Sequence, residues 1–250
     1  MRHPGRAALA VVAGALAMVS LHAQPFPKKV LYLTHSAGYK HEVVPLSMQL
    51  LPEIGKKNGF DVVATKDLAF LYPEELKKYD AVVFYTTGEL PIGDAEKANL
   101  LAWIKSGKGF IGIHCATDTF YKWADYGDMI GGYFNEHPWH QEVKIKVEDP
   151  NTPATKGLPN PWVLTDEIYQ FKNWDRSKLH VLLSLDTSSV DLTKKGVHRT
   201  DGDFANAWTK SYGSGRVFYS ALGHRAELWQ SPEYQAFLAG GIRWTLGLEN

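Results

Sequence analysis

The stretch GFIGIHCATDTF at positions 109–120 decides the fold that we expect for this chain. Its first five residues form an apolar run, which is typical of a strand buried on both faces of a parallel sheet. The run ends at His114, and Cys115, the only cysteine among 250 residues, follows directly. Ligands of open α/β sheets bind beyond the carboxyl ends of the strands, so this turn is a candidate functional site.

Strand and helix patterns alternate through the first half of the chain. The expected strands lie at residues 29–35, 60–65, 81–88 and 109–114. The expected helices lie at residues 43–59, 72–79 and 93–107. We expect Asp94 to cap the last of these helices. Strands joined by helices of this length predict a parallel sheet. The segments that should converge at its carboxyl edge are residues 35–41, 86–89 and 114–118.

The second half of the chain has the pattern of antiparallel strands with turn signals between them. These strands are expected at residues 141–149, 166–171, 180–186, 206–213 and 215–223. Residues 188–203 are polar and predict a long loop. A final helix at 231–247 starts with Ser231 as its cap and Pro232 at its first position.

Residues 1–23 have the pattern of a secretory signal peptide. Arg2 and Arg6 precede an apolar run at 7–19, and a cleavage point follows Ala23. An uncleaved anchor is the alternative. We therefore expect a periplasmic or secreted protein that consists of a single domain at residues 24–250.

The composition excludes several classes of partner. Without Arg2 and Arg6, 25 basic residues face 27 acidic ones, so we expect neither nucleic-acid binding nor, after signal cleavage, membrane binding. A single cysteine cannot form an internal disulfide, so the stability of the fold must come from its core. The sequence does not indicate an oligomeric state.

Five motifs occur in the order seen in one protein family. They are GYKH (38–41), GIHCATDTF (112–120), GGYFNEHP (131–138), GLP (157–159) with DEIY (166–169), and GRVFYSALGH (215–224). Together they resemble ThuA-like (trehalose utilisation) proteins over residues 29–247. The resemblance implies a flavodoxin-like, class I glutamine amidotransferase-like α/β fold. That fold has a mostly parallel sheet with helices on both faces and an antiparallel extension in the second half. It also implies a role in disaccharide and keto-sugar catabolism.

The chain departs from the pattern of this family at three positions. Thr152 and Asn206 stand where histidine and proline are common. Amidotransferases carry the motif Gly-x-Cys-x-Gly, whereas here His114 takes the place of the cysteine and Cys115 comes one residue later. We therefore expect Cys115 to be a small buried side chain. A Cys-dependent amide hydrolase is therefore the least favoured hypothesis for the function.

The expected catalytic residues are His114, His224 and Glu167. His114 is a candidate general base or metal ligand, and a histidine bonded into the turn is the alternative. His224 lies about where the fold family carries its triad histidine, with Glu227 as a candidate third member. Asp166 and Glu167 should face opposite sides of a strand, so we select Glu167 alone.

The remaining candidates surround this set. The expected substrate-binding residues are His41, Asp118, Tyr169 and Glu89; for Asp118, helix capping is the alternative. A divalent metal is the candidate cofactor, with His114, His137 and His224 as ligands. We expect His140 and Glu142 to lie on the solvated face of a strand.

The sequence leaves three functions open, and the expected partner is a small-molecule carbohydrate. The first is an enzyme that acts on a glycoside or 3-keto-glycoside with histidine-based, metal-assisted chemistry. The second is a non-catalytic sugar-binding module, for which an aromatic cluster formed by Trp123, Tyr126, Tyr133 and Trp139 would supply stacking platforms. Core packing of these rings is the alternative. The third is the Cys115-dependent amide hydrolase.

Overall fold

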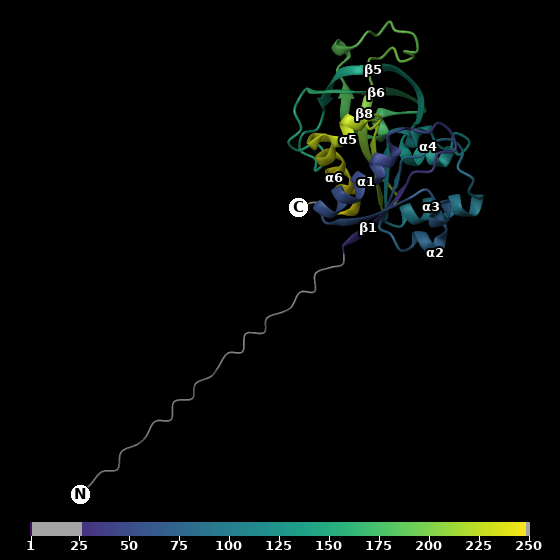
Figure 1. The fold of residues 1–250 in the computed structure, drawn as a ribbon, viewed down its shortest axis with the longest axis vertical. Coiled ribbons are helices and arrows are strands. Elements are labelled where there is room, and N and C mark those ends of the chain that lie inside the picture. The colour runs from purple at the N-terminus through teal and green to yellow at the C-terminus, as the bar shows by residue number, and fades with distance from the viewer. Residues whose placement is uncertain (2–26, 249–250) are drawn as a thin grey trace.

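The computed structural model describes Met1 and residues 27–248, which form one twisted sheet with helices around it (Figure 1). Within these residues the sheet has nine strands in the order β2-β1-β3-β4-β9-β8-β7-β5-β6. The strands are β1 (Lys28–Leu33), β2 (Phe60–Thr65), β3 (Ala81–Phe84), β4 (Gly109–Ile113), β5 (Tyr133–Val147), β6 (Trp162–Lys172), β7 (His180–Leu185), β8 (Ala205–Tyr212) and β9 (Gly215–Ser220). The predicted signal peptide falls outside the described residues.

The sheet changes from parallel to antiparallel at β9. Strands β2, β1, β3, β4 and β9 pair in parallel. From β9 to β6 every pairing is antiparallel. The predicted α/β fold with an antiparallel second half is confirmed, although the sheet is divided evenly rather than mostly parallel. The strand expected at 215–223 is also parallel to β4 on one side, which places the ends of β4 and β9 at the same edge.

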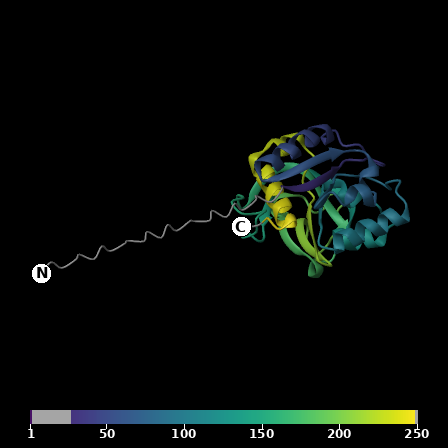
Figure 2. The ribbon, with the colours of Figure 1, turned by 90° about the horizontal axis from the view of Figure 1, so that it is seen from below.

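Helices cover both faces of the sheet, as Figure 2 shows. The α-helices are α1 (Val44–Lys57), α2 (Pro73–Leu76), α3 (Asp94–Lys105), α4 (Ala124–Ile130), α5 (Ala226–Gln230) and α6 (Pro232–Leu246). Short 3-10 turns are η1 (Leu68–Leu71), η2 (His114–Asp118), η3 (Arg176–Lys178) and η4 (Thr187–Ser189). The two faces arise from the period of two in the strands: Val30 of β1 belongs to the same core cluster as residues of α1, α5 and α6, whereas Leu31 belongs to the cluster that contains residues of α2, α3 and α4.

The two predicted helix caps have different outcomes. Ser231 caps α6, and its side chain accepts a hydrogen bond from the backbone of Tyr234. Asp94 is wrong as a cap, because Gly93 occupies the cap position and Asp94 is the first helical residue. The carboxylate of Asp94 instead lies in the first turn, where the positive end of the helix dipole favours a negative charge.

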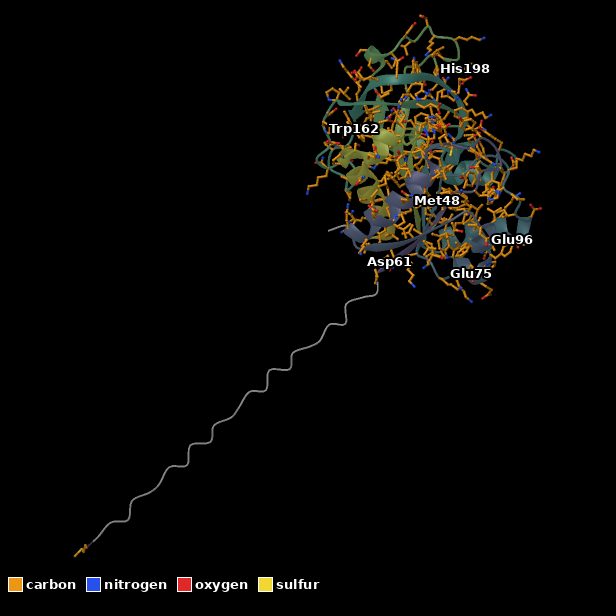
Figure 3. All side chains as sticks on the ribbon, viewed as in Figure 1. Met48, Asp61, Glu75, Glu96, Trp162 and His198 are labelled. Atoms are coloured by element: carbon orange, nitrogen blue, oxygen red, sulfur yellow. The ribbon has the colours of Figure 1, made fainter. Side chains whose placement is uncertain are left out.

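The polar loop at 188–203 is held to the sheet by buried side chains. Gln170 accepts the backbone N–H of His198 at 2.9 Å and donates to the carbonyl of Gly196. The indole N–H of Trp139 donates to the carbonyl of Asp191 at 3.0 Å. In Figure 3 the label of His198 lies at the end of the molecule opposite Asp61 and Glu75. No residue of this loop lines the cavity over the site described below.

None of the helices in residues 27–248 has the length and apolar character needed to cross a membrane.

Candidate histidine–carboxylate site

His114 sits directly after the central strand β4 in a left-handed backbone conformation, with φ of 48°. This region is sparsely populated by residues other than glycine, and histidine is among the few that enter it. The side chain is fully buried. Its Nδ1 donates to the carbonyl of Ala221 at 2.7 Å. That bond places the proton of the neutral ring on Nδ1, so Nε2 is left as a hydrogen-bond acceptor.

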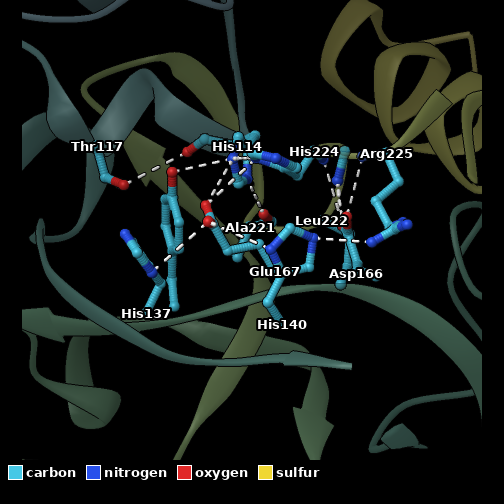
Figure 4. A network of polar contacts seen from close by, with 12 residues as sticks. His114, Thr117, His137, His140, Asp166, Glu167, Ala221, Leu222, His224 and Arg225 are labelled. Carbon is cyan, nitrogen blue, oxygen red and sulfur yellow. Dashed lines mark hydrogen bonds and ion pairs between the residues drawn. The ribbon is translucent and has the colours of Figure 1, made fainter. Parts of the chain in front are cut away.

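The Nε2 atom of His114 forms a triangle with two other side-chain atoms. It lies 3.3 Å from Nδ1 of His224 and 3.4 Å from Oε2 of Glu167, and the latter two atoms are 3.4 Å apart. In Figure 4 dashed lines join the carboxylate of Glu167 to the rings of His114 and His224. Two nitrogen atoms and one oxygen atom therefore converge on one point.

The charges of this triangle are coupled. Burial opposes the ionisation of Glu167, but its close contacts with the rings of His114 and His224 outweigh it and lower the pKa of Glu167 far below its ordinary value. The bond with Glu167 in turn raises the pKa of His224, against the opposing effect of burial. These contacts therefore favour the ionised form of Glu167 and the protonated form of His224.

His41 closes the cluster from the loop before α1. Its ring contacts those of His114 and His224 edge-on, with centroids 4.9 and 5.3 Å away. Nδ1 of His41 is buried and has no hydrogen-bond partner among the described residues. Burial and the two neighbouring histidines lower the pKa of His41 to about 3, so its ring is neutral. One donor atom from each of His41, His114, Glu167 and His224 lies within 4.8 Å of the others.

Asp166 supports the cluster from beneath, a role that sequence reasoning missed. Its buried carboxylate accepts the backbone N–H groups of Gly223, His224 and Arg225 at 2.7, 3.4 and 3.1 Å. It thereby fixes the loop after β9 that carries His224. The carboxylate pair in DEIY was the available signal, and period-two alternation correctly separates the two side chains.

The acidic partner of His224 is Glu167 and not Glu227. The carboxylate of Glu227 is largely exposed and faces Nε of Arg225 at 3.6 Å. It belongs to α5, which begins two residues after His224. The proposed role of Glu227 as a third triad member is therefore wrong.

A cavity of about 330 Å³ opens over the cluster. It is lined by Tyr39, His41, Asp118, Phe134, His137, Glu167, Tyr169 and His224. The hydroxyl of Tyr169 donates to Nε2 of His114 at 3.0 Å. Asp118 accepts from the hydroxyl of Tyr121 at 2.7 Å, and burial raises the pKa of Asp118. The structure thus brings six of the predicted residues around the cavity, with His114 beneath it.

Among the predicted substrate-binding residues Glu89 lies away from the cavity, and Cys115 is buried as expected. Glu89 accepts the backbone N–H of Lys122 at 3.0 Å and does not line the cavity. Cys115 is fully buried in the apolar core, and burial raises the pKa of its thiol well above the ordinary value. A reactive thiol is exposed and has a low pKa, so Cys115 has the properties of a packed side chain.

The histidines of β5 differ from expectation because the strand begins at Tyr133, well before residue 141. Nδ1 of His137 lies 3.6 Å from Oε1 of Glu167, and Nδ1 of His140 lies 4.0 Å from the same atom. His140 therefore faces the site and not only solvent. The four-residue cluster contains His41 and Glu167 in place of His137, which flanks it.

The fold and the site together define an α/β protein with a buried histidine–carboxylate cluster at the carboxyl end of its central strands. The family model for ThuA, described as trehalose utilisation, matches residues 29–245. The chain belongs to this family.

Solved structures share the fold. A ThuA-like protein from Bacteroides uniformis is 25% identical with a TM-score of 0.75, and the match covers 90% of this chain and 94% of that one. Another from Parabacteroides merdae is 20% identical with a TM-score of 0.69, covering 89% and 91%. A cytoplasmic protein from Salmonella typhimurium is 16% identical with a TM-score of 0.58, covering 87% and 99%. Curated protein sequences contain no significant match to this chain.

Proposed function

We propose that this protein is an exported enzyme of carbohydrate catabolism that acts on a glycoside or 3-keto-glycoside with the help of a divalent metal ion. The observation that carries the proposal is the triangle formed by His114, Glu167 and His224, with edges of 3.3, 3.4 and 3.4 Å. A tetrahedral ion with ligands at about 2.0–2.1 Å separates those ligands by roughly 3.3–3.4 Å.

The surroundings of the triangle also suit a metal ion. The hydrogen bond from His114 to the carbonyl of Ala221 is the outer contact that metal-binding histidines commonly make. Asp166 fixes the loop of His224, and His41 supplies a further neutral ring at the fourth side. Two or three imidazoles with one carboxylate favour a transition metal such as zinc over magnesium or calcium.

A divalent ion in this place would polarise a sugar carbonyl or lower the pKa of a bound water molecule. The chain itself supplies groups for moving protons on the cavity wall. Asp118 has a raised pKa, and His137 is half-exposed beside Glu167. Either group is a candidate for the base that removes a proton from the carbon next to a 3-keto group. The hydroxyl of Tyr169 donates to Nε2 of His114, and its oxygen remains available to accept a hydrogen bond from a substrate hydroxyl.

We further propose that the fold is a glutamine amidotransferase-like one in which the cysteine chemistry has been replaced. His114 has the left-handed backbone expected of the residue after the central strand, and Cys115 lies in the core beside it. Export is proposed from the N-terminal sequence pattern alone.

A non-catalytic sugar-binding module is the second candidate, because the aromatic rings of Tyr39 and Phe134 line the cavity. The aromatic cluster itself offers no platform there. Tyr126, Tyr133 and Trp139 are buried in the core, and Trp123 packs against Phe120 and Tyr126.

The test combines metal analysis with turnover. The protein is purified without chelator or affinity metal and assayed for bound metals and for conversion of 3-keto-glycosides. We expect about one divalent ion per chain and measurable turnover. Glu167→Gln and His114→Asn should abolish both, while His180→Asn, which alters an exposed histidine outside the cavity, should abolish neither. Saturable sugar binding without product would favour the binding module, and a metal-free, inactive protein would refute the proposal.

A further inference from the structure

A hollow of about 430 Å³ lies at the carboxyl ends of β1 and β2, beside the start of α1. It is distinct from the cavity over the cluster, with which it shares only His41 as a lining residue. Its polar lining residues are Thr34, His35, Ser36, Lys40, His41 and Lys66. Apart from His41, none of these residues has a role in the proposed function.

The hollow carries positive charge without an acidic partner. Lys40 and Lys66 line it, and no described carboxylate does. Within the part of the chain that the structure describes, neither ammonium group forms an ion pair or a hydrogen bond. The acidic residues next to these lysines along the chain have other surroundings. Asp67 accepts the backbone N–H of Ala69 at 2.9 Å, and Glu42 lines a different hollow.

The start of α1 adds to this positive potential. Val43 occupies the cap position without a side-chain hydrogen bond, and the first turn contains no acidic residue. The first two helical residues, Val44 and Pro45, line the hollow. The N-terminal end of a helix carries a partial positive charge that favours an anion. Because Pro45 has no N–H and Val44 donates to the carbonyl of His41 at 3.3 Å, the helix contributes its dipole rather than free N–H groups.

Hydrogen-bonding groups are also available around the hollow. Nδ1 of His35 donates to the carbonyl of Lys66 at 3.0 Å, which joins the ends of β1 and β2 and leaves Nε2 for another partner. The hydroxyl of Ser36 forms no hydrogen bond with a described residue.

His41 places an unsatisfied polar atom in the wall of the hollow. Its side chain is only 7% exposed, and its Nδ1 has no hydrogen-bond partner among the described residues. A buried polar atom without a partner has an energetic cost, which a bound ligand can remove. This observation is independent of the two lysines and of the helix dipole.

We propose that this hollow binds the phosphate group of a small molecule, present either as inorganic phosphate or as a phosphate monoester. Two unpaired ammonium groups match the charge of a phosphate dianion better than that of a single carboxylate. Lysine, helix N-termini and short polar side chains are groups that bind phosphate oxygens in proteins. The hollow is larger than a bare phosphate ion, so an ester also fits. The proposal does not depend on the proposed function, because the two concern different spaces.

The test is isothermal titration calorimetry of the purified protein in phosphate-free buffer at constant ionic strength. The ligands are inorganic phosphate, glycerol 3-phosphate and, as the control anion, chloride. We expect saturable binding of a phosphate ligand with a Kd of about 1 mM or tighter, and none of chloride. Tighter binding of the ester would identify an ester as the ligand, and tighter binding of inorganic phosphate would identify the free ion.

Variants locate the site. Lys40→Gln and Lys66→Gln should each weaken binding about tenfold, which is the loss of one hydrogen bond to a charged group. Both side chains are exposed, so we expect both variants to fold as the parent protein does. Lys195→Gln removes an exposed lysine outside the hollow and should leave the Kd unchanged. Glu167→Gln alters the cluster and should not weaken phosphate binding.

Three results would overturn the phosphate site. They are the absence of saturable binding, lysine variants that bind as tightly as the parent protein, and loss of binding in Glu167→Gln alone. The last result would place the phosphate on the cluster. The keto-glycoside turnover assay does not involve phosphate, so each of these results would leave the proposed function standing.

Discussion

The backbone N–H of Gly223 donates to the carboxylate of Asp166 at 2.7 Å, which joins the loop after β9 to the edge strand β6. The next residue on each side of this bond enters the cluster: His224 follows Gly223, and Glu167 follows Asp166. One buried contact therefore sets the distance between two residues that are far apart in the sequence. This relationship leads to the first of four predictions.

Asp166→Asn should destabilise the fold and disturb the cluster together. The amide has only one acceptor oxygen, and its NH2 group would face backbone donors that the carboxylate now satisfies. We expect a loss of about 2 kcal/mol in the free energy of unfolding, measured by urea denaturation, and weaker metal binding. Asp61→Asn, at an exposed position of β2, is the control. An unchanged metal affinity in Asp166→Asn would show that the loop does not need this support.

Substitutions of His114 should separate backbone strain from loss of the ligand. Asparagine tolerates the left-handed conformation at this position, whereas a β-branched residue does not. His114→Val should therefore be less stable than His114→Asn by about 1–2 kcal/mol in urea denaturation. Both variants should lose the metal ion. Equal stability of the two would mean that the backbone relaxes freely at this turn.

Cys115 should resist alkylation in the native protein. Its side chain is fully buried and burial raises the pKa of the thiol, so little thiolate is accessible. Mass spectrometry after iodoacetamide treatment should show an unmodified chain in buffer and a single adduct in urea. Turnover should be the same before and after the native treatment. Rapid native labelling with loss of activity would restore the cysteine enzyme as an explanation.

Asp80 should contribute stability that depends on pH. Burial opposes its ionisation, but the N–H of Lys29 at 3.0 Å and the ammonium of Lys108 at 3.1 Å outweigh it and lower the pKa of its carboxyl. A carboxyl whose pKa is lower in the folded state stabilises the fold above its unfolded value, near pH 4. That contribution is lost as the pH falls through the folded value.

The variant Asp80→Asn should therefore lose about 1–2 kcal/mol at pH 7, and this difference from the parent protein should shrink below pH 4. Urea denaturation at pH 7 and at a pH below 4 measures this difference in the free energy of unfolding. Asp61→Asn again serves as the control. A difference that stayed constant with pH would assign the effect to packing rather than to charge.

The sequence by itself determined the alternating strands and helices of the first half. Apolar runs such as that of β4 and helical spacing such as that of α3 are local signals, and they depend only on which faces of an element are buried. The position of His114 at the end of the central strand followed from the same reasoning. The burial of Cys115 followed from its one-residue shift along the turn.

Only the tertiary structure decided the distances within the site and which of the predicted residues form the four-residue cluster. His41, His114, Glu167 and His224 come from four separate segments, and their distances depend on sheet order and on the long β5–β6 hairpin. Sequence periodicity contains no information on the parallel pairing of β9 with β4, which brings His224 beside His114. Sequence periodicity also placed the start of β5 at residue 141, whereas the strand begins at Tyr133 and His140 faces Glu167. The reason is physical: periodicity reports the burial of one element, whereas a site forms from contacts between elements that only the packed chain specifies.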